Sequence, residues 1–371
     1  MITLLWDLMF YNFLILIIRN GYKRYGTTTI PIKSYLVLLI LLIIFGIWGL
    51  QMGDFSHYEE IIERIYARSG DSYDIKGIWL SHMEPQYNYL AIFCKGDHIL
   101  WRAIWQIIEF TGLFYLLSKL KMNNYEALYM VTLFSLQSIT AGRVSWGIVY
   151  FWLGLYLFLE TKEKKYLLFV AVSWLAHTSM ILLFALLPLI LIKPSKKLVI
   201  LTLFLMPAFI YLFEYVMTNL NIISTDNELL EYKLDNYTNT EYETTSAFGG
   251  SGMSNIAFLL HKPALYVTIF MFISTFVKNR INLTESQKRF MTLWGAVLIF
   301  TIAALFANVG SASYYQRYTM MLYLPTLLLF YKASGEELKD RSLFRKCLFI
   351  LWLSYNFEYI KAMYYFNVHG V

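Results

Sequence analysis

The sequence predicts an all-α fold, a polytopic membrane protein with about ten full spans plus a short two-helix hairpin, or about twelve helices. Of its 371 residues, 58% are hydrophobic and only 15% are charged, whereas soluble domains carry about 25% charged residues. The hydrophobic residues form runs close to the roughly 20 residues that cross a bilayer as a helix. The basic residues stand in short clusters between these runs, which indicates membrane topology and excludes a nucleic-acid groove.

Ten apolar runs are candidate spans. The first lacks the basic region and the cleavage site of a signal peptide, so we expect it to be a retained helix. The spans are expected at Ile2–Ile18, Tyr35–Gln51, Ile99–Leu120, Tyr125–Ala141, Trp146–Leu159, Leu198–Met217, Ile256–Val277, Phe290–Asn308, Thr319–Tyr331 and Cys347–Phe366. Together they predict a single integral membrane domain over residues 1–371.

The distribution of Lys and Arg gives the orientation. With the N-terminus outside, the inner segments hold 21 of the 31 basic residues, in accord with the positive-inside rule. Two long loops, 52–98 and 218–255, are then extracytoplasmic. Cys94 and Cys347 fall on opposite sides of the membrane, which excludes an intramolecular disulfide between them.

A 27-residue apolar run, 166–192, has lysine clusters at both ends. A single span would place one cluster outside, so we expect two short helices that enter the membrane and return around Ala176-His177-Thr178-Ser179. Non-helical backbone at that depth persists only where it is buried in protein or lines a wet cavity. His177 is therefore expected beside a cavity.

The first outer loop contains two helix signals. Ser56 and Glu59 fit a capping box for a helix that runs to about Arg68. Glu84 and Pro85 mark the start of a second helix, with proline at its first position. The second outer loop is acidic and ends in a glycine-rich stretch, which suits a lid.

Ionisable residues gather at the outer ends of the spans. Arg143 and Arg317 each top a hairpin, where a guanidinium can bind phosphate oxygens bidentately or reach the lipid headgroups. Asp54 and Glu84 can act as a general base or can simply favour a helix start. His177 can donate to phosphate, shuttle a proton or bond a neighbouring carbonyl. No metal cluster, dinucleotide fingerprint or phosphate-binding glycine loop occurs, so no cofactor and no metal are expected.

An ordered set of motifs is similar to a known family. Asp54-x-x-x-Tyr58, Glu84-Pro85-x-Tyr87-x-x-Leu90, Arg143, Ala176-His177-Thr178-Ser179 and Gln316-Arg317-Tyr318 resemble the EpsG-like family of Wzy-type polysaccharide polymerases. The resemblance covers nearly the whole chain. The Arg143 segment departs from the family pattern, because it reads Gly-Arg-Val-Ser-Trp.

The resemblance implies a GT-C-like helical bundle in the bacterial inner membrane. Such enzymes move a growing glycan from undecaprenyl diphosphate onto the next lipid-linked repeat at the extracytoplasmic face, without a metal. Glu84, Asp54 and His177 would then be catalytic, and Arg143 and Arg317 would bind the diphosphate. The expected glycan contacts are Tyr58, Tyr87, Tyr315 and Gln316, although an interfacial aromatic belt also explains the tyrosines.

The expected partners are the undecaprenyl-diphosphate-linked oligosaccharide, membrane lipids, a chain-length regulator and a flippase, with no nucleic acid. Two other functions remain open, a lipid-linked oligosaccharide flippase and an O-antigen ligase. Flippases carry charges deep inside several spans, and ligases usually have one dominant outer loop. This chain has two comparable outer loops, which favours the polymerase.

Overall fold

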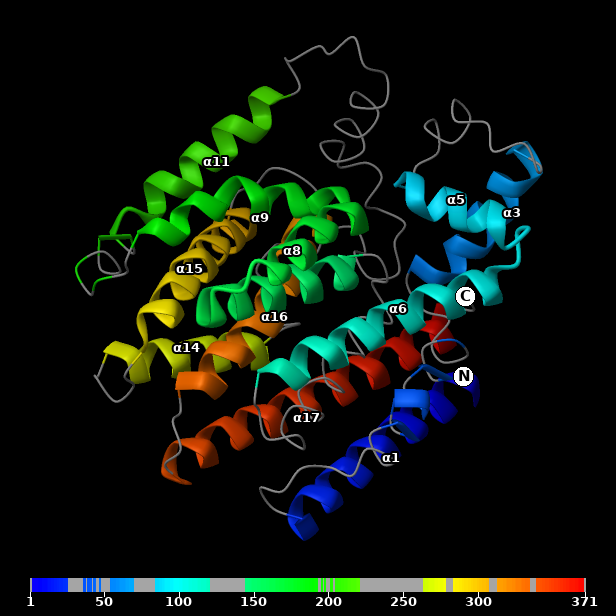
Figure 1. The fold of residues 1–371 in the computed structure, drawn as a ribbon, viewed down its shortest axis with the longest axis horizontal. Coiled ribbons are helices and arrows are strands. Elements are labelled where there is room, and N and C mark those ends of the chain that lie inside the picture. Colours follow the sequence, from blue (N-terminus) through cyan, green and yellow to red (C-terminus); the bar gives the residue numbers. More distant parts are fainter. Residues whose placement is uncertain are drawn as a thin grey trace. The chain divides into compact units, whose positions relative to one another are not determined.

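The computed structural model describes residues 2–25, 54–69, 84–120, 144–192, 204–220, 263–277, 283–306, 312–333 and 338–369, with isolated positions in 36–47 and 195–202. Helices make up this part of the chain, which contains no strand, so the predicted all-α class is confirmed for it (Figure 1). The predicted span 125–141 and nearly all of the loop 218–255 lie outside the described residues.

One described helix, Val144–Thr161, is long and apolar enough to cross a membrane. Shorter apolar helices of 10–17 residues are Leu8–Asn20, Lys165–Ala176, Ile181–Leu191 and Ala264–Val277. The full number of spans therefore stays a prediction.

The chain divides into two compact units, residues 1–180 with 355–371, and residues 181–354. The first unit contains the Val144–Thr161 helix and the end of α17 (Leu338–His369). Its other helices are α1 (Ile2–Tyr25), α3 (Asp54–Ser69), α5 (Pro85–Phe93), α6 (His98–Lys119), α8 (Lys165–Ala176) and η1 (Thr178–Met180). The helices α3 and α5 pack on each other and on the N-terminal part of α6 (Figure 1).

A tight turn joins α5 to α6. The backbone N–H of Gly96 donates to the Ala91 carbonyl at 3.1 Å and that of Lys95 to the Ile92 carbonyl at 2.9 Å, which is the Schellman pattern at a helix end. Lys95 and Gly96 take positive φ values of 53° and 77°. Asp97 then caps α6 by accepting from the next two free backbone N–H groups, so the direction of α6 is fixed from its first turn.

Glycines allow helices of this unit to approach closely. A Cβ added at Gly112 on α6 would lie 2.0 Å from the Tyr150 hydroxyl oxygen. A Cβ at Gly147 would lie 2.8 Å from the Met180 sulfur, and one at Gly154 would lie 3.0 Å from the Phe169 Cβ. The Val144–Thr161 helix is thus held against both α6 and α8 by small residues, as in many membrane bundles.

The apolar run 166–192 breaks where the sequence predicts. The helix α8 ends at Ala176, His177 is extended with φ −163° and ψ 140°, and η1 follows. The chain continues into the second unit as α9 (Ile181–Leu186) and η2 (Leu187–Leu191). The helical break is therefore confirmed, whereas the return of the second limb to the same membrane face stays a prediction.

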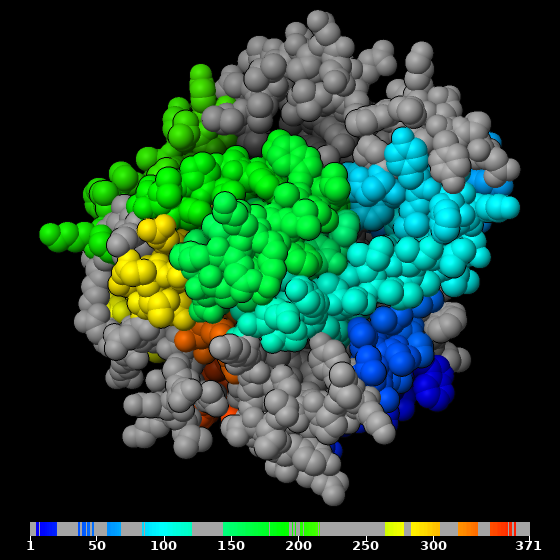
Figure 2. Space-filling view, in the orientation of Figure 1, coloured from blue at the N-terminus to red at the C-terminus, as the bar shows by residue number. Residues whose placement is uncertain are grey.

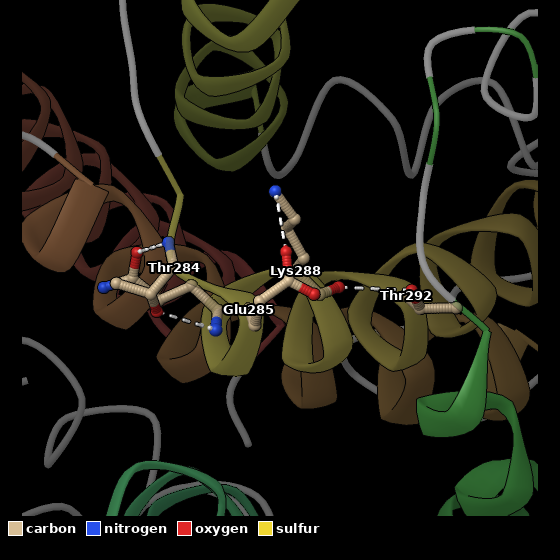
Figure 3. Close-up of polar contacts among 5 residues, drawn as sticks. Thr284, Glu285, Lys288 and Thr292 are labelled. Carbon is tan, nitrogen blue, oxygen red and sulfur yellow. Dashed lines mark hydrogen bonds and ion pairs between the residues drawn. The ribbon is translucent and has the colours of Figure 1, made fainter.

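The second unit is built around α15 (Glu285–Phe306), which packs on α11 (Met206–Leu220), on η2 and on α16 (Ala312–Ala333), while α14 (Pro263–Val277) packs on α16. A reciprocal capping box starts α15, because Thr284 Oγ1 accepts from the Gln287 N–H and Gln287 Oε1 accepts from the Thr284 N–H (Figure 3). Further along α15, the Thr292 hydroxyl donates to the Ile192 carbonyl at 2.7 Å, which fixes the end of η2.

The last helix, α17 (Leu338–His369), contributes residues to both units. Its Asn356 accepts a hydrogen bond of 2.6 Å from the Asn12 amide on α1. This bond ties the first described helix to the last one within the first unit.

Two sequence predictions are wrong. Ser56 lies inside α3, which includes Asp54, so Ser56 cannot be the N-cap of a capping box. Residues 314–318 lie inside α16, which starts two turns before the expected Thr319, so Arg317 stands on this helix near its start. The polar and aromatic residues of this stretch hid the helix from a reading based on hydrophobicity alone.

Candidate functional site

Trp101 on α6 is the centre of an aromatic cluster at the junction of α3, α5 and α6. Its side chain is fully buried, and its indole N–H donates to the Tyr87 carbonyl at 3.1 Å. The rings of Tyr58 and Tyr87 lie 5.6 and 5.8 Å from the Trp101 ring. Two of the four predicted glycan contacts are therefore brought together, but as buried rings that pack on a third aromatic side chain.

Glu84 stands at the start of α5. It takes extended backbone angles, φ −62° and ψ 144°, as the residue before Pro85 must, and its side chain does not cap the helix. The residue is 9% exposed. A nearly buried carboxylate at a helix start is a candidate general base.

His177 has a fixed orientation in the break after α8. Its Nδ1 accepts a hydrogen bond of 3.0 Å from the backbone N–H of Ser179 and lies 2.9 Å from the Ser179 hydroxyl. A ring nitrogen that accepts from an N–H carries no proton, so the proton of the neutral ring is on Nε2. Of the roles open from sequence, this geometry favours donation from Nε2 over proton shuttling through Nδ1.

The other predicted site residues are placed only in part. Asp54 is the first residue of α3, and Tyr315, Gln316 and Arg317 lie on α16, but the described structure does not include their side chains. Arg143 lies outside the described residues. The predicted joint binding of a diphosphate by the two arginines is therefore untested.

A row of polar side chains on α6 was missed from the sequence. Arg102, Gln106 and Glu109 are 6%, 0% and 0% exposed, and their spacing of four and three residues places them on one face of the helix. Glu109 accepts a hydrogen bond of 2.9 Å from the Ser145 hydroxyl on the next described helix. We call Arg102, Gln106 and Glu109 the α6 polar face.

The signal for this face was present in the sequence. Two charges and an amide at helical spacing inside a predicted span, Ile99–Leu120, are costly in a bilayer and usually mark function.

A small pocket lies at the Arg102 end of the α6 polar face. Its volume is about 10 Å³, room for about one water molecule, and it is lined by Tyr58, Glu59, Ile62, His98, Trp101 and Arg102. At its rim, His98 Nδ1 lies 3.5 Å from a Glu59 carboxylate oxygen. Figure 2 shows the outward side chains of α5 and α6 around this region as one continuous cyan surface.

The site so described combines carboxylates, a guanidinium, an amide and aromatic rings, mostly buried. Such a set can bind a hydroxyl-rich molecule and can accept a proton from it. Within the described part of the chain, no three His, Cys, Asp or Glu side chains gather closely enough to hold a metal ion.

Comparison with known proteins agrees with the motif resemblance. The family model described as the EpsG family matches residues 34–368, which include all of the site residues above. No curated protein and no solved structure matches the chain. The match supports a membrane protein that takes part in polysaccharide biosynthesis. The chain therefore belongs to the EpsG family.

Proposed function

We propose that this protein is a polysaccharide polymerase that transfers a growing glycan from undecaprenyl diphosphate onto a lipid-linked repeat unit at the extracytoplasmic face. The observation that carries the proposal is the family match over residues 34–368. The nearly buried Glu84 beside the cluster around Trp101 supports it, because glycosyl transfer to a hydroxyl needs a carboxylate of this kind.

The reaction is a substitution at the anomeric carbon of the growing glycan. A hydroxyl oxygen of the acceptor repeat forms the new bond to this carbon, and the bond from the carbon to the diphosphate oxygen breaks. The electron pair leaves with undecaprenyl diphosphate, and the hydroxyl proton passes to Glu84. Asp54 would orient the acceptor sugar.

Positive charge and hydrogen-bond donors would stabilise the leaving diphosphate. Arg143 and Arg317 are the proposed cations, and Nε2 of His177 is the proposed neutral donor. Replacement of either arginine by lysine keeps the charge but loses the bidentate fork. The polymer length is then expected to fall sharply, and chains of wild-type length in both variants would refute the assignment.

Glu84→Gln tests the base directly. The amide keeps the shape of the carboxylate but cannot accept the proton, so we expect the rate to fall about 100-fold or more. The assay is polymer formation by purified protein in nanodiscs, supplied with lipid-linked repeats and resolved on a gel. Asp54→Asn is the comparison variant, and the two roles must be exchanged if Asp54→Asn loses the activity that Glu84→Gln retains.

One observation favours a second candidate, the lipid-linked oligosaccharide flippase. Arg102 and Glu109 lie buried within α6, so charge is not confined to the outer ends of the spans as the sequence first indicated. A gel of lipid-linked glycan from cells that lack the gene distinguishes the two functions. Accumulation of single repeats without long chains supports the polymerase, and loss of all surface repeats supports the flippase.

A further inference from the structure

Ser179 makes two contacts with one atom of the His177 ring, in the break after α8. The backbone N–H of Ser179 donates to Nδ1 at 3.0 Å, and the Ser179 hydroxyl oxygen lies 2.9 Å from the same nitrogen. Because a backbone N–H can only donate, Nδ1 carries no proton, and the hydroxyl is the second donor to it. His177 is only 6% exposed, so water competes little for these two bonds.

The first of these bonds has a structural reason. The first N–H groups of a helix have no carbonyl partner within it, and His177 stands directly before η1 with the extended backbone of an N-cap, φ −163° and ψ 140°. Its Nδ1 accepts from the second residue of η1, as capping side chains do. The cap uses Nδ1, and the proton of the neutral ring is on the other nitrogen, Nε2.

The second bond is one that capping does not need. Alanine at position 179 would keep the backbone N–H, and with it the cap, and alanine has a higher helix propensity than serine. What the Ser179 hydroxyl adds is a second donor on Nδ1. The hydrogen bond made by one imidazole nitrogen decides which nitrogen carries the proton. The hydroxyl therefore stabilises the tautomer with the proton on Nε2 and restrains the plane of the His177 ring.

The break that holds His177 lies against the start of another helix. A Cβ added at Gly147 would lie 3.2 Å from the Ala176 Cβ and 2.8 Å from the Met180 sulfur, so residues on both sides of His177 contact Gly147. Gly147 is in the first turn of the helix that directly follows Arg143 in the sequence. The Nε2 donor is thus held beside the helix that the proposed diphosphate ligand precedes.

We propose that Ser179 is a positioning residue, which holds the His177 ring with its proton on Nε2 so that this N–H donates to the leaving diphosphate. The proposal rests on the polymerase function above and adds one residue to it. A ring whose unprotonated nitrogen already accepts two hydrogen bonds gives a bond and takes no proton, so the proton of the acceptor hydroxyl passes to Glu84. Ser179 acts only through His177 and does not touch the diphosphate.

A double-mutant cycle tests this dependence. Purified protein in nanodiscs is titrated with undecaprenyl diphosphate. Ser179→Ala removes one hydrogen bond to the ring and should weaken binding about three- to tenfold, whereas Ser179→Thr keeps both donors and should bind like the wild type. His177→Asn keeps a preferred N-cap but loses the Nε2 donor, so it should weaken binding about tenfold or more. In the His177→Asn background, Ser179→Ala should weaken binding no further.

Nitrogen-15 NMR of histidine-labelled protein reads the ring directly, with the His177 signals identified by their loss in His177→Asn. In the wild type, Nε2 should resonate as a protonated nitrogen and Nδ1 as an acceptor, and Ser179→Ala should move the Nδ1 signal towards that of a free acceptor. The matched control is Ser173→Ala on α8, which removes a fully buried hydroxyl bonded to the Val170 carbonyl. This control should change neither the binding nor the signals.

Three results would overturn the positioning role. They are unchanged binding in either single variant, equal weakening by Ser179→Ala with and without the His177 ring, and a wild-type ring with its proton on Nδ1. Ser179→Cys, with a weaker donor of similar shape, repeats the cycle should the alanine variant fail to fold. The polymerase function fails separately, if wild-type protein forms no polymer from lipid-linked repeats, and the binding cycle then decides by itself whether Ser179 positions a diphosphate donor.

Discussion

The contact between Gly112 and Tyr150 gives the sharpest test of how the first unit is packed. In Gly112→Ala, the new Cβ would lie 2.0 Å from the Tyr150 hydroxyl oxygen and 2.5 Å from its Cζ. The Tyr150 ring is 5% exposed, and its hydroxyl donates to the Ile108 carbonyl at 2.9 Å. The Tyr150 ring must therefore move by on the order of an ångström or more, which overpacks its surroundings and breaks the hydrogen bond. These two effects outweigh the better helix propensity of alanine, so we expect the free energy of unfolding to fall by about 1–3 kcal/mol.

Thermal unfolding of the purified protein measures this cost. The matched control is Gly295→Ala on α15, where an added Cβ meets no atom within 4 Å, so its stability should stay equal or rise by up to about 1 kcal/mol. In a Tyr150→Leu background, Gly112→Ala should lower the free energy of unfolding much less, because the clashing ring is absent. A Gly112→Ala protein that melts as high as Gly295→Ala would refute the packing argument.

Three further predictions concern other parts of the chain. Ser145→Ala removes the hydroxyl donor to the buried Glu109 carboxylate and should lower the free energy of unfolding by about 1–3 kcal/mol. Ser118→Ala, at an exposed hydroxyl on α6, should change the free energy of unfolding by less than about 0.5 kcal/mol. Burial raises the pKa of Cys94 to about 11 from 9.0, so maleimide should react about 100-fold more slowly than with an ordinary thiol near pH 8 and faster only as the pH approaches 11. Glu163→Cys and Ser195→Cys should both label from the cytoplasmic side, and labelling of one from each side would refute the hairpin.

Local signals in the sequence were sufficient for several elements. Pro85 fixes its own φ and lacks a backbone N–H, so it marks the start of α5 whatever packs around it. Lysine clusters on both sides of one apolar run predicted the break at His177. These features depend on residues close together in the chain, which is why the sequence alone predicts them.

Tertiary features of the site could not be predicted in this way. Tyr58 and Tyr87 are polar enough for an interface, yet both pack on Trp101, a contact that depends on how three helices meet. The Glu109–Ser145 hydrogen bond joins residues 36 positions apart. The choice of tautomer at His177 depends on the backbone angles after α8, which no spacing of residue types reveals.

The hydrogen bond between Asn12 and Asn356 has a consequence for biogenesis. The two residues are separated by 344 positions, so at a synthesis rate of about 5–20 residues per second the ribosome needs roughly 20–70 s to make the second after the first. All of residues 181–354 are synthesised during that interval, while the first unit still lacks part of α17. The early helices of the first unit must therefore wait as an incomplete assembly, so truncations near the end of the chain should affect the first unit first.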